Sequence, residues 1–535
     1  MMKITKAFDV QKLSCWLILL AFTILLAACS TEPASLANDE EATDEEVTDE
    51  QGNDNPVDEN FNADINNDGE LNILFIGSSR SIQSDVAAFS LNNVAEELNS
   101  ILSQDATITA AVNVSYEDIY NTKALSTALG SGGNEFDYTY YTHSLFQYYH
   151  WPEGQAERIS NLKGNGEKDW DYVIMASDPY IISKTPGFYS LGVNQIAATV
   201  IEGGAKALLV LPWPKDEAKT TTISSFEEFT YRTASGAKVD LEVVPAGLAW
   251  ENLEGSLKDG DNVHPSPNGA YLTAASIYAQ LYDKSASTSA YTFNDVIADE
   301  ALTSTKNART ASHFSGEFNF TSPFKSCDID KSLLRYNHTG TSSENGIMAG
   351  LNWVINKDDQ TQLERDGAPL VDFNMGRANT NFEANKRYKI DASKFDFSFG
   401  FPMQDGSATG NTTMRYGIDK RGSQNENGTD LGVALYMVRQ NELPTGRAIP
   451  IRALYAQMKE LNIATSAYRD SWHMSRDLDK AAGAYMCTLL TGRCDLGMEP
   501  MDQSSGEWKT WRAHKLGYET AYTLMTLKGD VPECN

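Results

Sequence analysis

The stretch that determines the fold class of this chain reads Leu71-Asn72-Ile73-Leu74-Phe75-Ile76-Gly77-Ser78-Ser79. The mostly apolar run over residues 71–76 is typical of a buried strand, because strands that are covered on both faces carry nearly continuous apolar sequence. A turn of small residues follows directly. It lies at the carboxyl end of the strand, where open α/β sheets bind their ligands. The stretch therefore predicts an α/β domain with a site at this turn.

The sequence downstream alternates between strand and helix patterns. Strands are predicted at residues 108–114, 171–176 and 207–211, and helices at residues 84–102, 191–202 and 270–281. Such alternation predicts a mostly parallel sheet with helices on both faces. We therefore expect residues 71–285 to form one α/β domain.

A second polar cluster, Asp261-Asn262-Val263-His264, lies just before the last of these helices. A Ser hydroxyl becomes a nucleophile when a base removes its proton, and an imidazole does so best when a carboxylate orients it. Ser79, His264 and Asp261 supply these three groups. Ser78 is a rival nucleophile, and the alternative for the whole set is a turn that binds an anion or only shapes a loop.

These motifs resemble those of the SGNH (GDSL-like) hydrolases. Gly77-Ser78-Ser79 resembles the nucleophile block of that family, and Asp261 to His264 resembles its final Asp-x-x-His block. The resemblance implies a flavodoxin-like three-layer α/β/α sandwich and ester hydrolysis through an acyl-enzyme, without a metal or another cofactor. It covers the first domain only, and it favours Ser79 over Ser78.

The groups that would stabilise an oxyanion depart from the family pattern. Besides the backbone amide of Ser79, the family uses a Gly after the second strand, for which Gly130, Gly132 and Gly133 are the candidates. The family's Asn after the third strand is missing. Ser177-Asp178 stands there instead, so the Ser177 hydroxyl is a candidate donor, although an acidic neighbour would repel an oxyanion unless it turned away.

Residues 1–29 are predicted to be an export signal. Basic residues precede an apolar run over residues 13–28, which is shorter than the ~20 residues that span a bilayer. Leu26-Ala27-Ala28-Cys29 resembles the bacterial lipobox, which implies lipidation of Cys29, and the following Ser30 favours the outer membrane. A retained transmembrane helix is the alternative.

An acidic segment follows the signal. Residues 31–70 contain fifteen Asp and Glu and no Lys or Arg, which is half of the net charge of −30. We expect residues 30–70 to be a disordered tether, or simply a linker with no further role. The negative charge argues against a nucleic-acid partner. Asp64 to Gly69 imitates the start of a calcium loop, but Phe75 occupies the twelfth position, where an acidic ligand belongs.

The second half of the chain is predicted to comprise a linker at residues 286–309 and a second α/β or α+β domain at residues 310–535. Strands are predicted there at residues 370–373 and 433–438. Four cysteines remain after processing, and they allow up to two disulfides in any of three pairings. They are Cys327, Cys487, Cys494 and Cys534. Neither they nor the histidines show the spacing of a metal site.

The second half also contains Asp470-Ser471-Trp472-His473, another Asp-x-x-His, followed by Gly483-Ala484-Tyr485. Asp470 and His473 are therefore candidates for a second site in a diverged copy of the first domain. Gly483 follows His473 at the tenth position, whereas Gly269 follows His264 at the fifth. The nearest strand-and-turn candidate, residues 370–376, has no hydroxyl. A second catalytic centre, a degenerate copy and an unrelated accessory domain remain alternatives.

Two functions fit these patterns. The complete Ser/Asp/His set favours a surface-anchored serine esterase in the cell envelope, acting on a small ester or on acyl groups of extracellular polysaccharide. The missing Asn favours a non-catalytic binding lipoprotein with a degenerate hydrolase fold. Both place the chain at a membrane through its lipid anchor.

Overall fold

A computed structural model describes the chain in several stretches of one compact unit, residues 57–535. The backbone and most side chains are described for residues 63–78, 81, 94–119, 145–150, 154–164, 169–177, 186–213, 223–253, 257–260, 264–316, 451–464, 475–491 and 497–531, and for residues 179, 182 and 318. Short strands between residues 336 and 449 are described by their backbone. The predicted signal and most of the predicted tether lie outside the described residues.

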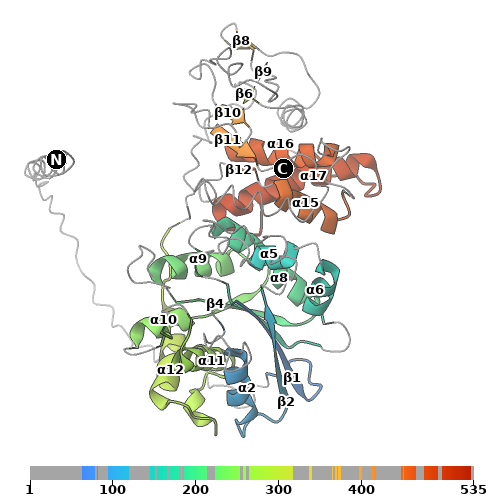
Figure 1. Ribbon diagram of the computed structural model, residues 1–535. Coiled ribbons are helices and arrows are strands. Elements are labelled where there is room, and N and C mark those ends of the chain that lie inside the picture. The colour runs from blue at the N-terminus through green and yellow to red at the C-terminus, as the bar shows by residue number, and fades with distance from the viewer. Residues whose placement is uncertain are drawn as a thin grey trace, which may run out of the picture. The chain divides into compact units, whose positions relative to one another are not determined.

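The first sheet is parallel throughout. Its strands are β1 (Glu70–Gly77), β2 (Ala111–Asp118), β3 (Tyr172–Met175), β4 (Lys206–Val210) and β5 (Leu241–Val244), shown in Figure 1. They lie in the order β2-β1-β3-β4-β5, with every neighbouring pair parallel. This is the flavodoxin-like strand order.

Helices cover both faces of this sheet. One layer holds α2 (Val94–Ser103), α10 (Ala246–Asn252), α11 (Pro267–Tyr282) and α12 (Asp295–Thr310). The other holds α5 (Leu145–His150), α6 (Gln155–Leu162), α8 (Pro186–Glu202) and α9 (Ile223–Ser235). Side chains of β1 alternate between two cores: Ile73 and Phe75 enter the first, and Leu74 and Ile76 the second. The predicted three-layer α/β/α fold is confirmed.

Most predicted elements of this half agree with the structure. The third and fourth strands and the last two helices are present, with ends that differ by a few residues. The second strand begins at Ala111 and ends at Asp118, later than predicted. The first helix is described from Val94 onward, since residues 82–93 lie outside the described residues. Helices α9 and α10 and strand β5 were not predicted.

The predicted linker at residues 286–309 is wrong. It contains a 3-10 turn at Ala286–Thr288 and then α12, which packs against α11. The side chain of Asn294 caps α12 by accepting hydrogen bonds from the backbone amides of Val296 (3.1 Å) and Ile297 (3.3 Å). Ile297, Ala298 and Ala301 then enter the first core at helical spacing. Residues 286–309 therefore belong to the first α/β/α sandwich.

The predicted tether ends earlier than residue 70. Ala63 is buried in the first core, and the backbone amide of Ile65 donates to the Asp171 carboxylate (2.8 Å). The Asp64 side chain accepts hydrogen bonds from the amides of Asp68 (3.2 Å) and Gly69 (2.9 Å). The segment that imitates a calcium loop therefore closes a turn onto its own backbone, and this turn leads into β1.

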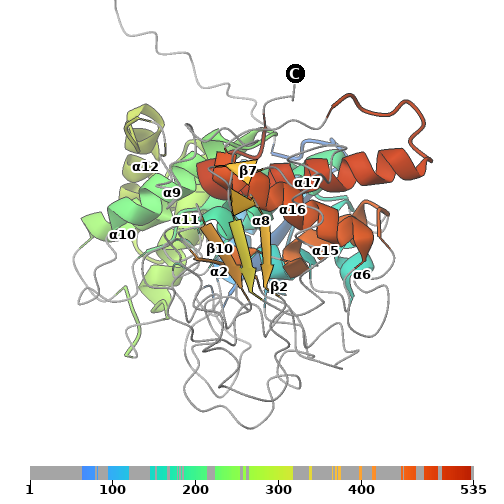
Figure 2. The same ribbon diagram turned by 90° about the horizontal axis from the view of Figure 1, so that it is seen from above.

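Three C-terminal helices cover the outer side of α8. They are α15 (Ile451–Glu460), α16 (Arg476–Thr491) and α17 (Gly506–Thr526), and α17 lies along α8 (Figure 1, Figure 2). A Cβ atom on Gly187 would lie 2.8 Å from Leu524 Cα, so the two backbones touch. Ser190 Oγ donates to the Leu527 carbonyl (3.0 Å). Helix α8 is therefore buried on both its sheet side and its outer side, which explains its nearly continuous apolar sequence.

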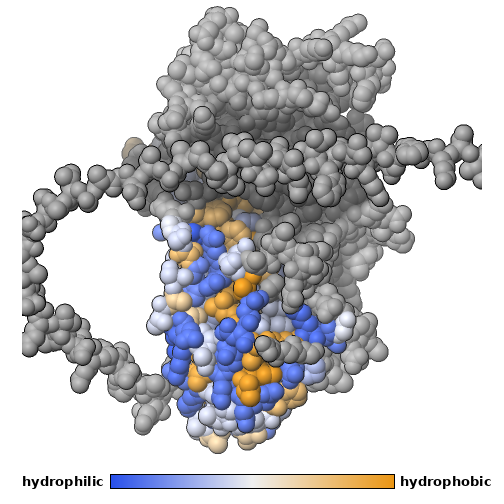
Figure 3. Space-filling view, turned by 90° about the vertical axis from the view of Figure 1, so that its left-hand side faces the viewer, coloured by the Kyte–Doolittle hydropathy of each residue, from blue (hydrophilic) through white to orange (hydrophobic). Residues whose placement is uncertain are grey.

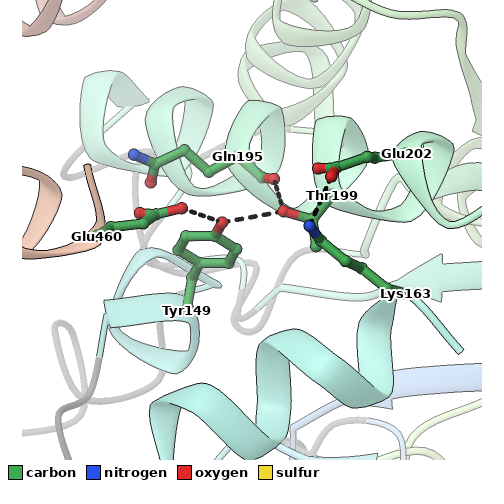
Figure 4. Close-up of polar contacts among 6 residues, drawn as sticks. All are labelled: Tyr149, Lys163, Gln195, Thr199, Glu202 and Glu460. Atoms are coloured by element: carbon green, nitrogen blue, oxygen red, sulfur yellow. Dashed lines mark hydrogen bonds and ion pairs between the residues drawn. The ribbon is translucent and has the colours of Figure 1, made fainter. Parts of the chain in front are cut away.

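Polar contacts cross the same boundary. The Tyr149 hydroxyl, on α5, donates to the Glu460 carboxylate at the end of α15 and lies 2.9 Å from Thr199 Oγ1 on α8 (Figure 4). Thr199 Oγ1 donates to the Gln195 carbonyl (2.9 Å). The Gln195 side chain in turn donates to Gln457 Oε1 (3.2 Å), on α15. These groups hold α15 in a fixed position against α5 and α8.

A second parallel sheet is formed by the short strands of the second half. They are β6 (Tyr336–Thr339), β9 (Val371–Asn374), β10 (Phe397–Gly400), β11 (Thr413–Tyr416) and β12 (Ala448–Ile449), in the order β9-β6-β10-β11-β12. All four neighbouring pairs are parallel. Strands β7 (Glu364–Arg365) and β8 (Ala368–Pro369) form a separate antiparallel pair. The strand predicted at residues 370–373 is β9; residues 433–438 lie outside the described residues.

The described surface and cysteines do not test the predicted cell-envelope location or the predicted disulfides. None of the described helices is both long and apolar enough to cross a membrane. The described surface seen in Figure 3 is mainly hydrophilic, with hydrophobic residues in small separate patches. Cys487 is a buried thiol on α16, and the other three mature cysteines lie outside the described residues, so their pairing stays a prediction.

The buried His514 on α17 makes stability depend on pH. Burial, with a smaller contribution from the charge of Lys480, lowers its pKa from 6.5 to about 3. The imidazole is protonated at a higher pH in the unfolded chain than in the folded chain. Its contribution to the free energy of unfolding is therefore fully present above pH 6.5 and is lost as the pH falls toward 3. Between pH 7 and pH 5, we expect the free energy of unfolding of the wild type to fall by about 2 kcal/mol more than that of the His514→Gln variant. Urea unfolding of both proteins at the two pH values measures this, and equal losses would contradict it.

Candidate active site

The turn after β1 requires a glycine. A Cβ atom on Gly77 would lie 2.6 Å from Ser81 Oγ and 2.8 Å from the ring of Phe75. The chain folds back at once, because the Ser81 amide donates to the Ser78 carbonyl (2.8 Å). Ser79 and Arg80 are the two residues between these hydrogen-bonded groups, and they lie outside the described residues.

Ser78 has a structural role. Its side chain is fully buried, and its carbonyl also accepts a hydrogen bond from the Tyr116 hydroxyl (3.2 Å). Burial raises the pKa of Tyr116, so this hydroxyl stays protonated and keeps donating. Of the two serines, Ser79 therefore remains the candidate.

Ser177 lies on the neighbouring strand end. The Ala176 amide donates to the Ile76 carbonyl (2.8 Å), which continues the β1–β3 ladder past Met175 and brings Ser177 beside Ser78. Ser177 is 2% exposed, and its hydroxyl has no hydrogen-bond partner among the described residues. A buried hydroxyl without a partner is unfavourable by roughly 1–3 kcal/mol, so it is uncommon unless a ligand completes it. Asp178 lies outside the described residues.

The loop that carries His264 is held at both of its ends. Lys258 and Pro265 form an antiparallel bridge, the Asp259 amide donates to the His264 carbonyl (2.9 Å), and the Ser266 amide donates to the Leu257 carbonyl (2.8 Å). His264 is half-buried. Asp261 is among residues 261–263, which lie outside the described residues.

Helix α11 locates this loop at the carboxyl edge of the first sheet. Ser266 caps the helix, and the Tyr278 hydroxyl near its other end donates to Asp105, which lies just after α2 and before the start of β2. Tyr278 is therefore at the amino edge. Eleven residues of helix span about 16 Å, which is close to the length of a five-residue strand. The His264 loop thus shares the carboxyl edge with the Gly77 turn and Ser177.

A pair of tryptophans supports the start of α11. A Cβ atom on Gly269 would lie 2.2 Å from the Leu257 carbonyl oxygen and 2.5 Å from the Trp250 ring. Trp250 stacks on Trp213, with ring centroids 4.0 Å apart. Because Trp213 follows β4, this stack ties the His264 loop to the end of a central strand.

The structure does not describe the other predicted site residues. Gly130, Asp470 and His473 lie outside the described residues, as do Ser79 and Asp261. The structure thus places the surroundings of the predicted triad on one edge, and contact among its three side chains stays a prediction. A pocket of about 440 Å³, lined by residues that include Tyr231, Asp240 and Phe314, lies at the start of β5 and therefore at the opposite edge.

One motif was missed in the sequence. Strand β6 ends at Thr339 and is followed directly by Gly340-Thr341-Ser342, a second Gly-x-Ser after the first strand of a parallel sheet. The available signal was the Gly-x-Ser itself. It was overlooked because Tyr336-Asn337-His338-Thr339 is too polar to be predicted as a buried strand.

Replacing Gly269 tests the support of the His264 loop. Gly269→Ala must push its Cβ into the backbone of Leu257, so we expect a loss of at least about 2 kcal/mol in the free energy of unfolding. Gly260→Ala is the matched control: Gly260 lies in the same loop, no atom of the described residues lies within 4 Å of its Cβ position, and the change should affect stability little. Denaturant unfolding of both variants measures the difference; equal stabilities would show that α11 is not packed as described.

Comparison with known proteins gives only distant similarity. No protein-family profile and no curated protein matches the sequence. Among solved structures, a candidate SGNH hydrolase from Slackia heliotrinireducens is 17% identical, with 39% of this chain and 97% of that chain covered and a TM-score of 0.28. A DUF4886 family protein from Bacteroides uniformis is 13% identical (46% and 97% covered, TM-score 0.31), and a lipase from a goat rumen metagenome is 10% identical (40% and 98%, 0.28). Likeness at this level carries no argument about activity, and the fold assignment depends on the strand order and burial described above.

Proposed function

We propose that the first α/β half of this chain is a serine esterase with Ser79, His264 and Asp261 as its catalytic residues. The observation that carries the proposal is the buried, partnerless Ser177 hydroxyl beside the Gly77 turn, on the same sheet edge as the His264 loop. An ester oxyanion at this edge would give the Ser177 hydroxyl the acceptor that the described residues do not supply.

The reaction follows from the roles of these groups. Ser79 Oγ attacks the ester carbonyl carbon while His264 takes the Ser79 proton, and Asp261 orients the imidazole. The resulting oxyanion accepts hydrogen bonds from the Ser79 amide and the Ser177 hydroxyl, with Gly130 as a further candidate donor. His264 then protonates the departing alcohol. Water, deprotonated by His264, hydrolyses the acyl-enzyme and restores Ser79.

The N-terminal sequence supports a location at the cell surface. Cys29 is the proposed lipidation site, and the acidic residues 30–62 separate it from the α/β unit. Such a tether suits a large, immobile substrate, so acyl groups on extracellular polysaccharide are the proposed target. The corresponding location is the outer membrane, to which the protein would be attached as a lipoprotein.

A binding lipoprotein is the second candidate function. The observation that favours it is the Ser177-Asp178 sequence after β3, where the resembled family has an Asn. In this case the fold would hold an ester or sugar without cleaving it. Activity measurements separate the two functions.

Substitution of the two serines and of His264 tests the assignment of the nucleophile. Residues 57–535 should hydrolyse short-chain p-nitrophenyl esters, and Ser79→Ala and His264→Ala should each lower kcat by at least about 10³-fold, because neither residue works without the other. Ser78→Ala is the matched control, since Ser78 is buried. If activity is lost in Ser78→Ala and kept in Ser79→Ala, the nucleophile is Ser78 and the assignment of Ser79 is wrong. An inactive wild type would favour the binding lipoprotein.

The second prediction concerns the oxyanion donor. Ser177→Ala should lower kcat by about 10²-fold with little change in KM, because the hydroxyl would donate mainly to the transition state. Ser276→Ala is the matched control: Ser276 is also buried, on α11, but already donates to the Leu272 carbonyl (2.9 Å). Steady-state kinetics of the two variants measure this, and equal kcat values would remove Ser177 from the mechanism.

A further inference from the structure

Trp213 is a buried side chain with an unsatisfied hydrogen-bond donor. It lies three residues after the end of β4 and is 4% exposed, and its indole Nε1 has no hydrogen-bond partner among the described residues. The other tryptophans that the structure describes all donate this N–H: Trp170 to the Asn161 carbonyl (2.6 Å), Trp250 to Thr273 Oγ1 (3.4 Å), Trp508 to Glu499 Oε1 (2.9 Å) and Trp511 to the Gly497 carbonyl (3.3 Å). Trp213 thus departs from the rule that a buried indole finds an acceptor.

The direction of this N–H is fixed by the ring. Trp213 stacks on Trp250 with ring centroids 4.0 Å apart and an angle of 6° between the ring planes. The N–H lies in the plane of its ring, so a ring that is stacked over the face cannot accept the hydrogen bond. A hydroxyl can rotate toward an acceptor, whereas an indole N–H turns only with the whole side chain. Only a group at the edge of the stack can therefore satisfy this donor.

Backbone contacts hold the segment that carries Trp213. The Leu211 amide donates to the Val244 carbonyl (2.9 Å), and the Gly247 amide donates to the Leu211 carbonyl (2.8 Å). A Cβ atom on Gly247 would lie 2.5 Å from the Pro212 carbonyl oxygen, so α10 packs directly on the residue before Trp213. The unsatisfied donor is therefore part of a packed and hydrogen-bonded segment.

The tryptophan stack lies between two described parts of the candidate active site. Ser177 and Trp213 follow the ends of β3 and β4, which are neighbours in the sheet. The Trp250 ring would lie 2.5 Å from a Cβ atom on Gly269, at the start of α11. Since α11 begins directly after the His264 loop, the stack places Trp213 at the carboxyl edge, on the side of that loop.

The proposed reaction gives this side of the site to the alcohol part of the ester. His264 protonates the departing alcohol, so that part of the substrate must lie against the His264 loop. Ser177 would serve the oxyanion. Trp213, which contacts the start of α11 through Trp250, is then the described donor on the alcohol side. An indole N–H donates and cannot accept, so its partner must be an atom with a lone pair, such as a hydroxyl or ether oxygen.

We infer that Trp213 forms a subsite for the alcohol part of the ester and that its indole N–H donates to a sugar oxygen there. The inference rests on the proposed esterase function. A carbohydrate offers ring and hydroxyl oxygens near its ester group, whereas an alkyl alcohol leaves the buried N–H without an acceptor. The subsite therefore selects esters of carbohydrates over esters of alkyl alcohols that carry the same acyl group.

Two acetate esters of similar shape test this selectivity on the full chain. One is methyl glucoside acetylated on its primary hydroxyl. The other is cyclohexylmethyl acetate, which has a ring of the same size and no oxygen outside the ester group. Trp213→Phe keeps an aromatic ring in the stack and removes the N–H. We expect it to lower kcat/KM for the sugar ester by about 10-fold and to change kcat/KM for the alkyl ester by less than about twofold.

Trp170→Phe is the matched control. It also removes a buried indole N–H, but Trp170 lies before the start of β3, at the amino edge, and its N–H donates to the Asn161 carbonyl (2.6 Å). The ratio of the two kcat/KM values should therefore stay as in the wild type. Melting temperatures check the fold of each variant. If Trp213→Phe does not fold, the wild type decides the question, because equal kcat/KM values for the two esters overturn the subsite.

A binding measurement separates the subsite from the proposed catalysis. In the Ser79→Ala background, which should not cleave the ester, calorimetry should show that Trp213→Phe weakens binding of the sugar ester by about 10-fold. If the wild type cleaves both esters and Trp213→Phe leaves their ratio unchanged, the subsite is overturned and the esterase stands. If the wild type cleaves neither but Trp213→Phe weakens binding, the esterase is overturned and the sugar subsite stands. A wild type that neither cleaves nor binds the sugar ester overturns both.

Discussion

The structure depends on the burial of α8 from two opposite sides. Its inner side packs on the first sheet and its outer side on α17, so a helix that would be a surface element in a single α/β sandwich is here a core element. Glycine makes two contacts of α8 with other helices close: a Cβ on Gly192 would lie 2.3 Å from the amide nitrogen of Phe146 on α5, and one on Gly187 would meet Leu524 on α17. The two halves are thereby joined into one unit, and the second half covers apolar surface that the first cannot leave exposed.

The candidate site is built where this rigid sheet ends. Its turn is fixed by Gly77, its neighbouring strand contributes Ser177, and its histidine loop is bridged to Leu257 and supported by Trp250. Each of these described anchors is a backbone contact or a buried ring. Anchors of this kind would supply the pre-organisation that stabilising a developing oxyanion requires.

The sequence predicted the parts of the fold that have strong apolar patterns. β1, β3 and β4 were predicted correctly because they are buried on both faces and therefore have nearly continuous apolar sequence. Helix α12 was taken for a linker since Asp295, Lys306 and Arg309 obscure its apolar stripe. β6 was missed because it is polar. The burial of Ser78 and the unsatisfied hydroxyl of Ser177 are properties of packing, and no local pattern in one sequence reports them.

The turn at residues 63–69 has a consequence for how the protein is presented. It anchors the chain at the amino end of β1 by hydrogen bonds to Asp64 and Asp171, whereas the Gly77 turn lies at the other end of the same strand. Eight residues of strand separate the two points by about 26 Å. The described chain thus begins at the edge of the sheet opposite the candidate site, so its point of entry leaves the strand-end edge uncovered.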